Sequence, residues 1–189
     1  MPAVHRAWRA PIPLRLPGDR TTPTRSHPVA KPKASSTSGT GPISRERLIE
    51  LLNEDLAREY QAIIAYVVYS QVITGARFMS IAKELEVHAK EELSHALILS
   101  KQIDYLGGTP TVTPKPVKMS DKAEDLLRFD LDNETETIRA YQARVRQCEA
   151  LGEFAMAEHI RDILKQEQEH QIDLATALGE PPPDMTSRA

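Results

Sequence analysis

Between residues 44 and 178, apolar side chains recur every three or four positions in four long stretches, which is the spacing of amphipathic helices. Each stretch also places at least one ionisable residue in the middle of the apolar stripe that would face a core. These residues are Glu59 in the first stretch, His88, Glu92 and His95 in the second, Glu134 in the third, and Glu167 and His170 in the fourth. An unpaired buried carboxylate is costly or shifts its pKa. A chain that folds on these stripes must therefore neutralise several carboxylates at one level of its core, and bound cations are the simplest means.

Capping and breaking residues mark the ends of the four stretches. We expect helices over 44–74, 76–106, about 122–151 and 153–178, with Ser44 capping the first and Ser120 and Asp121 capping the third. Glycines follow each helix, as is typical of helix C-termini. No stretch has the alternating pattern of a β-strand. The sequence predicts an all-α domain.

The connections predict how the helices pair. Few residues join the first helix to the second and the third to the fourth, so each pair should form an antiparallel hairpin. The segment 109–119, TPTVTPKPVKM, contains three prolines that favour an extended path. Extended, it reaches roughly 40 Å, close to the roughly 42 Å length of a helix of about 28 residues. The second and third helices should therefore run parallel, in a four-helix bundle with one long crossover.

The two ends of the chain differ in composition from the helical part. Residues 1–43 hold seven basic residues and one acidic residue, whereas the remainder holds 17 basic and 26 acidic residues. Frequent prolines prevent a helix from propagating in the first segment. We expect 1–43 to be a disordered basic tail, 44–179 to be the folded bundle, and 180–189 to be a disordered C-terminal tail. The basic tail fits a solvated segment, an arm for a partner or nucleic acid, or a targeting segment or misplaced start.

Several classes of protein are excluded by composition. No run of 18 apolar residues is present, so no membrane span is expected. Residues 1–43 lack the apolar centre of a secretory signal, and we expect a cytoplasmic protein. The single cysteine excludes an internal disulfide framework and any paired-cysteine zinc or rubredoxin site.

The ionisable residues form two copies of one pattern. ExxH motifs occur at 92–95 and 167–170. The interval from Glu59 to the first motif equals the interval from Glu134 to the second. The second half of the chain therefore repeats the pattern of one glutamate followed by one ExxH motif. An i, i+3 pair points toward one side of a helix and can hold one metal ion. A lone ExxH in a Glu-rich helix is usually a solvated face, but two such motifs on apolar stripes indicate a metal centre. Oxygen and imidazole donors without thiolate suit iron or manganese.

These motifs resemble those of bacterioferritin, within the ferritin-like superfamily. The run LNEDLAREYQAIIAY at 52–66 is similar to that family's first-helix motif, and KEELSHA, DLDNE and ILKQEQEH carry the other motif residues. The resemblance covers 44–179 and implies a ferritin-like bundle that binds two iron ions per subunit. The residues it implies as ligands are Glu59 and Glu134 at the ends, Glu92 and Glu167 as bridges, and His95 and His170 completing one ion each.

Two departures from bacterioferritin are visible. That family binds haem through a Met directly after the second-helix glutamate, where this chain has Leu93, so no haem is expected. The short fifth helix of 24-subunit cages has no counterpart in the Pro-rich sequence GEPPPDMTSRA. The resemblance therefore implies a homo-oligomer without implying a 24-subunit shell.

Other residues near the predicted centre leave alternatives open. His88 is an additional ligand, a relay site for iron or a hydrogen-bonded core histidine. Tyr66 and Tyr141 both fit core packing with a partner for the hydroxyl group, and either is a candidate electron donor beside a di-iron centre. Tyr66 matches the family and is the better candidate. Cys148 is expected to be a small buried side chain, and Glu91 is expected on a solvated helix face.

Three functions fit the sequence. The first is a ferroxidase that oxidises Fe(II) with oxygen or hydrogen peroxide for iron storage or detoxification. The second is a peroxide-removing enzyme, similar to rubrerythrin or manganese catalase, that retains two metal ions. The third is a DNA-associated or scaffold protein that uses the basic tail, with the metal in a structural role.

Overall fold

The computed structural model describes residues 43–185, which are all-α as predicted. The helices are α1 (Arg45–Val72), the short 3-10 helix η1 (Ala76–Phe78), α2 (Met79–Tyr105), α3 (Ala123–Ala150) and α4 (Phe154–Leu178). No strand occurs within the described range. No helix of these residues is long and apolar enough to cross a membrane. The predictions for 1–42 and 186–189 lie outside the described residues.

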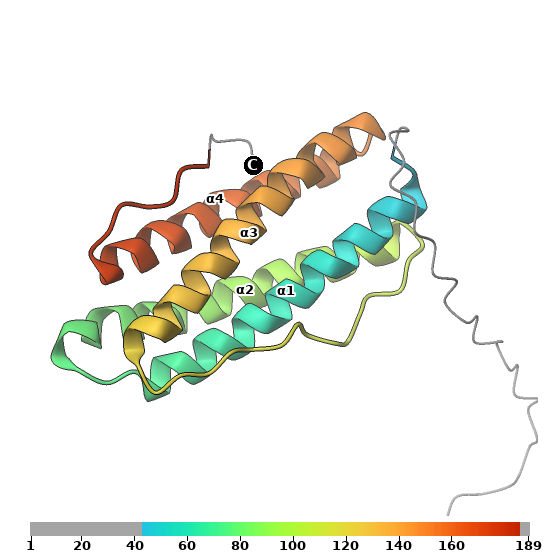
Figure 1. Cartoon of the computed structure of the whole chain (residues 1–189). Helices are drawn as coiled ribbons and strands as arrows, with labels where there is room; N and C mark the ends of the chain where they lie inside the picture. Colours follow the sequence, from blue (N-terminus) through green and yellow to red (C-terminus); the bar gives the residue numbers. More distant parts are fainter. Residues whose placement is uncertain (1–42, 186–189) are drawn as a thin grey trace, which may run out of the picture. The chain divides into compact units, whose positions relative to one another are not determined.

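The four long helices form two hairpins packed on each other, α1 with α2 and α3 with α4 (Figure 1). Across the two hairpins, α1 contacts α3 and α2 contacts α4. The start of α3 lies at the end of the bundle where α2 also starts, so these two helices run parallel (Figure 1). This arrangement confirms the predicted bundle with one long crossover.

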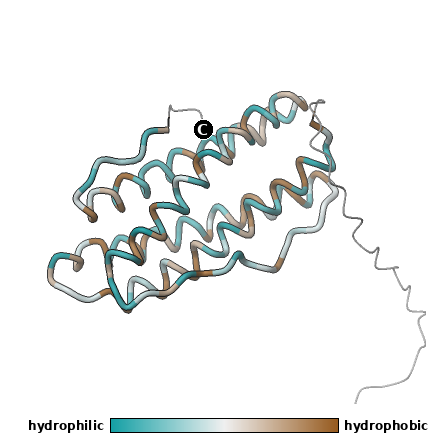
Figure 2. Tube along the Cα trace, viewed as in Figure 1, coloured by the Kyte–Doolittle hydropathy of each residue, from teal (hydrophilic) through white to brown (hydrophobic). Residues whose placement is uncertain are grey.

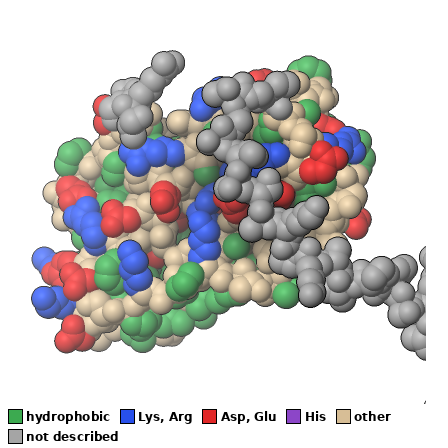
Figure 3. Space-filling model, turned by 45° about the vertical axis from the view of Figure 1, so that its right-hand side comes forward, with side chains coloured by type: hydrophobic (Ala, Val, Ile, Leu, Met, Phe, Trp, Pro, Cys, Tyr) green, Lys and Arg blue, Asp and Glu red, His purple; other side chains and the backbone are tan. Residues whose placement is uncertain are grey.

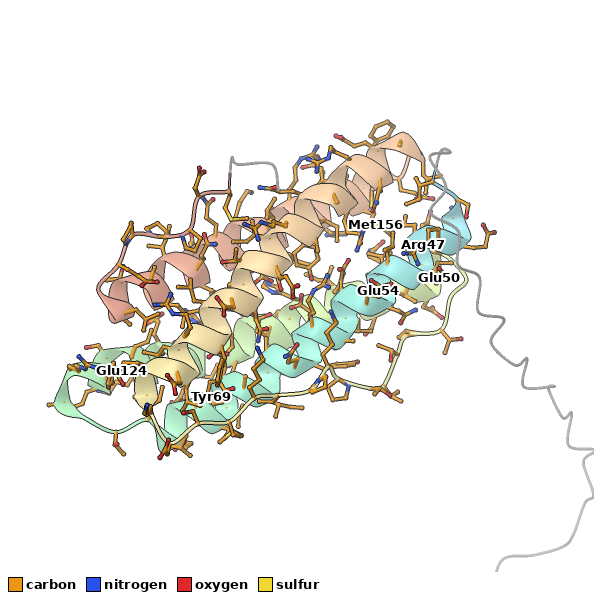
Figure 4. The ribbon with its side chains drawn as sticks, in the orientation of Figure 1. Arg47, Glu50, Glu54, Tyr69, Glu124 and Met156 are labelled. Carbon is orange, nitrogen blue, oxygen red and sulfur yellow. The ribbon has the colours of Figure 1, made fainter. Side chains whose placement is uncertain are left out.

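The crossover between α2 and α3 runs along α1 in an extended path. The backbone N–H of Lys115 donates to the carbonyl of Ala57 at 2.9 Å, and the Gln61 side-chain amide donates to the carbonyl of Pro116 at 2.7 Å. Nearer the end of α1, the Tyr69 hydroxyl, labelled in Figure 4, donates to the carbonyl of Lys118. Bonds to α1 thus replace the internal hydrogen bonds that a polyproline-like segment lacks.

Most helix ends agree with their sequence signals. Ser44 caps α1, since its Oγ accepts the backbone N–H of Arg47 at 3.2 Å. Gly179 ends α4 in the left-handed region, with a φ of 75° that favours glycine. The predicted cap of α3 is wrong: the helix begins at Ala123 after Lys122, and the Ser120 hydroxyl instead accepts the backbone N–H of Lys122. Ser120 also donates to Asp125 at 2.8 Å, which uses it in the turn before the helix.

Residues 180–185 follow α4 without regular secondary structure. Glu180 accepts a hydrogen bond from Nη2 of Arg128 on α3 at 2.6 Å, and the Gln171 amide lies 3.5 Å from the sulfur of Met185. The disorder predicted for 180–189 stays a prediction.

The core is divided into two apolar clusters. One contains Leu56 of α1, Leu99 of α2, Cys148 of α3 and Ile160 of α4, among other residues. The second lies toward the opposite end of each helix and contains Tyr66, Leu85, Leu131 and Leu174. Figure 2 shows apolar residues recurring along all four helices on both sides of the middle. The ionisable residues of the sequence stripes occupy the layer between the two clusters.

Candidate metal centre

Four carboxylates and two imidazoles meet in the layer between the apolar clusters. Each of the six residues is at most 2 % exposed, and all four long helices contribute. The residues are Glu59 on α1, Glu92 and His95 on α2, Glu134 on α3, and Glu167 and His170 on α4. The six residues predicted from sequence are therefore brought together.

The six residues form two overlapping groups of four. Within each group, one donor atom per residue lies within 4.8 Å of the others. The first group contains Glu59, Glu92, His95 and Glu167, and the second contains Glu92, Glu134, Glu167 and His170. Glu92 and Glu167 belong to both groups, whereas each of the other four residues belongs to one. Two cations placed side by side would share the carboxylates of the common pair.

Both histidines turn the same ring nitrogen toward the carboxylates. Nδ1 of His95 lies 3.3 Å from Glu59, 3.2 Å from Glu92 and 3.1 Å from Glu167. Nδ1 of His170 lies 3.0 Å from Glu92 and 3.6 Å from Glu167. The imidazoles thus approach the carboxylate cluster from opposite halves of the duplicated chain.

The outward ring nitrogens are held by residues that the sequence analysis did not identify as part of the site. Nε2 of His95 lies 2.9 Å from Oε1 of Gln166, and Nε2 of His170 lies 2.9 Å from Oε2 of Glu91. The Gln166 amide also donates to Glu91 at 3.2 Å, so the two supports are joined. A proton held on Nε2 leaves the Nδ1 lone pair free for a cation, which is the usual role of such partners.

The expectation that Glu91 lies on a solvated face is therefore wrong. Its side chain is one-third exposed and contacts His170 across the bundle. Glu91 and Gln166 occupy equivalent positions of the two halves, since each directly precedes the glutamate of an ExxH motif. This equivalence of position was the feature of the sequence that could have identified both residues as part of the site.

Two tyrosines support the carboxylates that belong to one group only. The Tyr66 hydroxyl donates to Oε1 of Glu134, and the Tyr141 hydroxyl donates to Oε1 of Glu59. Each tyrosine thus orients the carboxylate of the other half of the duplication. The structure thus gives the hydroxyl groups of Tyr66 and Tyr141 equivalent partners, as expected for core tyrosines with a hydroxyl partner.

Without a cation, the cluster has more acceptors than donors. Glu59 Oε2, Glu92 Oε1 and both oxygens of Glu167 are buried without a hydrogen-bond partner in the described chain. Burial and the neighbouring carboxylates raise the pKa of Glu59 and of Glu134 well above the ordinary range. Burial opposes the charge on His170, but Glu167 and Glu92 raise its pKa to about 12.

Without cations, Glu59 and Glu134 therefore hold protons, whereas hydrogen bonds that include those from the two histidines outweigh burial and lower the pKa of Glu92 and of Glu167. Oxygen donors with two imidazoles and no thiolate match the preferences of iron and manganese, and the unpartnered oxygens are the donors that such ions require. Cys148 lies in an apolar cluster away from the site, and burial raises the pKa of its thiol to about 11. The residues present fit a pair of hard divalent cations.

A narrow cavity reaches the carboxylates from the side where α1 contacts α3. Its volume is about 10 Å³, which is room for about one water molecule. Arg58 and Gln61 line it on α1, and Asn133 and Thr137 line it on α3. Only small molecules and ions fit such an opening.

Two further buried carboxylates lie near the centre and were not predicted. Asp55 and Asp130 occupy equivalent positions of the two halves, four positions before Glu59 and Glu134. Asp55 accepts a hydrogen bond from Nε of Arg144 at 2.6 Å. Asp130 Oδ2 has no hydrogen-bond partner among the described residues, and burial raises the pKa of Asp130 well above the ordinary range. The repeat spacing could have identified both positions.

His88 is buried but lies outside the two groups of four. Its ring stacks on that of His170, with 4.0 Å between the ring centroids, and meets Tyr66 edge-on at 5.3 Å. Burial, with a smaller contribution from His170, lowers the pKa of His88 to about 3.

A family comparison agrees with this arrangement. The model of the ferritin-like domain matches residues 49–182 of the chain. The bacterioferritin of Brucella melitensis is 26% identical over 141 residues, which cover 71% of this chain and 88% of that protein. The bacterioferritin of Desulfovibrio desulfuricans is 28% identical over 127 residues, which cover 67% and 71% of the two chains.

Solved structures show the same fold. A protein from Bacillus anthracis described as a ferritin-like diiron-carboxylate protein superimposes with a TM-score of 0.68 and 34% identity, covering 71% of this chain and 96% of that one. A dodecameric thioferritin from Bacteroides fragilis, described as bacterioferritin-related, superimposes with a TM-score of 0.67 and 27% identity. That match covers 73% of this chain and 88% of the other.

Proposed function

Because the chain belongs to the ferritin-like domain family, we propose that it binds two Fe(II) ions at the buried centre and oxidises them to Fe(III). The observation that carries the proposal is the pair of overlapping four-residue groups that share Glu92 and Glu167. The oxidation would serve iron storage or detoxification in the cytoplasm. Manganese is the alternative metal for the same donors.

The proposed roles of the six residues follow their places in the two groups. Glu59 and His95 would hold one ion, Glu134 and His170 the other, and the two shared glutamates would bridge them. Each Fe(II) gives up one electron, so the pair reduces oxygen to hydrogen peroxide, or hydrogen peroxide to water, with uptake of two protons. Carboxylates are hard donors that favour the ferric state, which assists this oxidation.

The surrounding residues would position the donors for this reaction. Gln166 and Glu91 hold the outward nitrogens of the two imidazoles at 2.9 Å, which keeps their inner nitrogens directed at the cluster. Tyr66 and Tyr141 hold one oxygen of each terminal carboxylate. The two Fe(II) ions supply both electrons of this reaction, so Tyr66 would act as an electron donor only where the oxidant takes up a further electron. The narrow cavity would exclude substrates larger than the oxidant and the cation.

Aerobic addition of Fe(II) to the purified protein tests the proposal. We expect rapid formation of ferric iron by the wild-type chain and its loss in Glu92→Ala. Glu86→Ala is the matched control, because Glu86 lies on the same helix but is exposed and accepts a hydrogen bond from Gln71 at the surface. Oxidation by Glu92→Ala at the wild-type rate would contradict the site assignment.

The same measurement distinguishes storage from peroxide removal. Retention of hundreds of iron ions per assembly is the result expected for storage. Retention of about two ions per chain, with rapid consumption of hydrogen peroxide, would instead support a rubrerythrin-like or manganese-catalase-like enzyme. The buried centre favours this second candidate over oxidation of large organic substrates, because its cavity holds only a water-sized molecule.

We also propose that the chain forms a homo-oligomer. The Bacteroides fragilis relative is described as dodecameric. In this chain, large apolar side chains are exposed on both helices of the first hairpin: Ile64, Val67 and Val72 on α1, and Val87, Leu93 and Leu97 on α2. Such side chains are typical of a surface that another protein covers. Measurement of the mass in solution, with Val67→Glu as the disrupting variant, tests this surface.

The charge on one face of the bundle is mixed. Figure 3 shows acidic and basic side chains interspersed on the face in view. Nearly all of the basic tail expected at 1–43, for which binding to nucleic acid is one reading, lies outside the described residues. The expected absence of haem also stays a prediction. Deletion of 1–43 should abolish any DNA retardation while leaving iron oxidation intact.

A further inference from the structure

His88 breaks the internal duplication of the chain. The offset that relates Glu92 to Glu167 places Ile163 at the position equivalent to His88, and Ile163 is buried in an apolar cluster. Two carboxylates near His88 are also unmatched: His159 occupies the position equivalent to Glu84, and Ile98 occupies the position equivalent to Asp173. Only one half of the duplicated chain therefore carries this set of three residues.

The three residues lie close together where α2 contacts α4. One donor atom from each of Glu84, His88 and Asp173 lies within 4.8 Å of the others. Nε2 of His88 is 3.4 Å from Oδ2 of Asp173, whose side chain is 45% exposed. The cluster thus reaches from the solvent edge of the bundle to a buried ring.

The buried imidazole is not explained by core packing alone. His88 is 2% exposed, and its Nδ1 has no hydrogen-bond partner within residues 43–185. Its Nε2, the nitrogen that faces the proposed cluster, is 3.4 Å from Asp173, which is too far for a good hydrogen bond. Nearly all buried side-chain polar atoms have a partner, and an exception requires an explanation such as an ion. An apolar residue, as at the equivalent position 163, would fill the same space without this cost.

We propose that Glu84, His88 and Asp173 form an accessory site for a divalent transition-metal cation. One imidazole and two carboxylates are donors that suit Fe²⁺, Mn²⁺, Co²⁺ or Zn²⁺. The site lies on the α2–α4 side, whereas the narrow cavity reaches the centre from the α1–α3 side. The ring of His88 stacks on that of His170, which places the accessory site next to one half of the dinuclear centre.

This site does not depend on the proposed oxidation, because it requires only that the cation binds. Its test therefore uses Zn²⁺, which has no redox chemistry. Crystals of the full chain soaked with Zn²⁺ should show an anomalous peak about 2.0–2.2 Å from a ring nitrogen of His88 and from a carboxylate oxygen of Asp173. Peaks at the dinuclear centre in the same crystals would show that the protein is folded and loaded.

Two variants and a control sharpen the test. Asp173→Asn keeps the shape of the side chain, and His88→Ile introduces the residue found at the equivalent position of the second half. Each variant should lose the accessory peak and retain the central peaks. Asp162→Asn, on the same helix as Asp173 but paired with Lys165 at the surface, should retain all of them.

Titration calorimetry with Zn²⁺ should agree, with one fewer ion bound per chain in either variant than in the control. The proposal would be overturned if wild-type crystals showed peaks at the dinuclear centre but no peak at the accessory site. A peak that persists in both variants would also overturn it. Because Asp173 is partly exposed, its substitution preserves the test even if His88→Ile fails to fold.

Discussion

Glu92 and Glu167 each belong to both donor groups, whereas Glu59 and Glu134 each belong to one. This difference predicts how metal is lost on substitution. Glu92→Gln removes a donor from both proposed metal positions while keeping the size of the side chain. Glu59→Gln removes a donor from one position and leaves the second group complete. We therefore expect Glu92→Gln to bind neither ion tightly and Glu59→Gln to retain one.

The expected change in Tm follows from the linkage between metal binding and folding. An ion present at 100 times its dissociation constant adds about 2.7 kcal/mol to the free energy of unfolding. For a chain of this size, each kcal/mol raises Tm by roughly 2–4 °C. Two ions should therefore raise the Tm of the wild-type protein by about 11–22 °C, and one ion should raise that of Glu59→Gln by about 5–11 °C. The Tm of Glu92→Gln should rise little when metal is added.

The metal-free comparison provides an internal control. Glu59 and Glu92 are buried among other carboxylates, with an oxygen of each left without a hydrogen-bond partner in the described chain. Replacing either by glutamine removes a carboxyl group from this cluster. With a chelator present, Glu59→Gln should be at least as stable as the wild-type chain, because burial and the neighbouring Glu92 raise the pKa of Glu59. Glu92→Gln should be less stable, because hydrogen bonds from Glu59, His170 and His95 outweigh burial and lower the pKa of Glu92. The contribution of metal binding is therefore measured, for each variant, as the difference between its Tm with metal and its Tm with the chelator.

Thermal denaturation with and without Mn²⁺, together with calorimetric counting of the bound ions, checks the prediction. All chains in this comparison also carry Asp173→Asn, so that the proposed accessory site adds no ion to the count. Glu167→Gln should behave like Glu92→Gln and bind neither ion tightly. Glu134→Gln should behave like Glu59→Gln and retain one ion. Two tightly bound ions in Glu92→Gln, or loss of both ions from Glu59→Gln, would refute the assignment of shared and terminal residues.

Four further predictions concern the metal centre and the residues near it. Metal affinity should fall on acidification, since burial raises the pKa of Glu59 and its proton must leave before a cation binds; calorimetry in buffers of different ionisation enthalpy measures the released protons. Asp55→Asn should lower the free energy of unfolding by about 3 kcal/mol, because it leaves a buried guanidinium group without its carboxylate. Asp130→Asn should instead stabilise the chain relative to wild type, increasingly as the pH rises above the ordinary carboxyl value, because the folded state holds this proton more tightly than the unfolded state. Urea denaturation at pH 5 and pH 8 checks both aspartates. Tyr66→Phe and Tyr141→Phe should each weaken metal binding by about 10–100-fold, and unequal losses would contradict the equivalence of their contacts.

The fold was predictable because each helix carries its own signals. The apolar period marks the buried face, Ser44 and Gly179 mark helix ends, and the prolines of 109–119 exclude a helix between the two hairpins. The six central residues were predictable for a related reason. Residues on one stripe of a helix must face the same core, and an exact repeat of their spacing sets the two halves at the same level.

The supports of the centre were not predictable in the same way. Glu91 contacts His170, and Gln166 contacts His95, each from a helix of the other hairpin. The repeat places Asp55 and Asp130 at equivalent positions, but only Asp55 meets an arginine, because Arg144 has Tyr69 as its counterpart in the first half. A repeat in the sequence therefore does not determine whether the partners are also repeated.

The sequence by itself determined the four helices, the crossover and the identity of the six residues at the centre, since helical periodicity and spacing along one chain contain that information. The resemblance to bacterioferritin already implied that Glu92 and Glu167 are shared, and both belong to the two groups of four. Only the tertiary structure decided how the histidines and tyrosines are held, and that His88 lies beside Glu84 and Asp173. These features depend on the distances between side chains of different helices. Such distances arise from the packing of one hairpin on the other, which no local pattern in the sequence specifies.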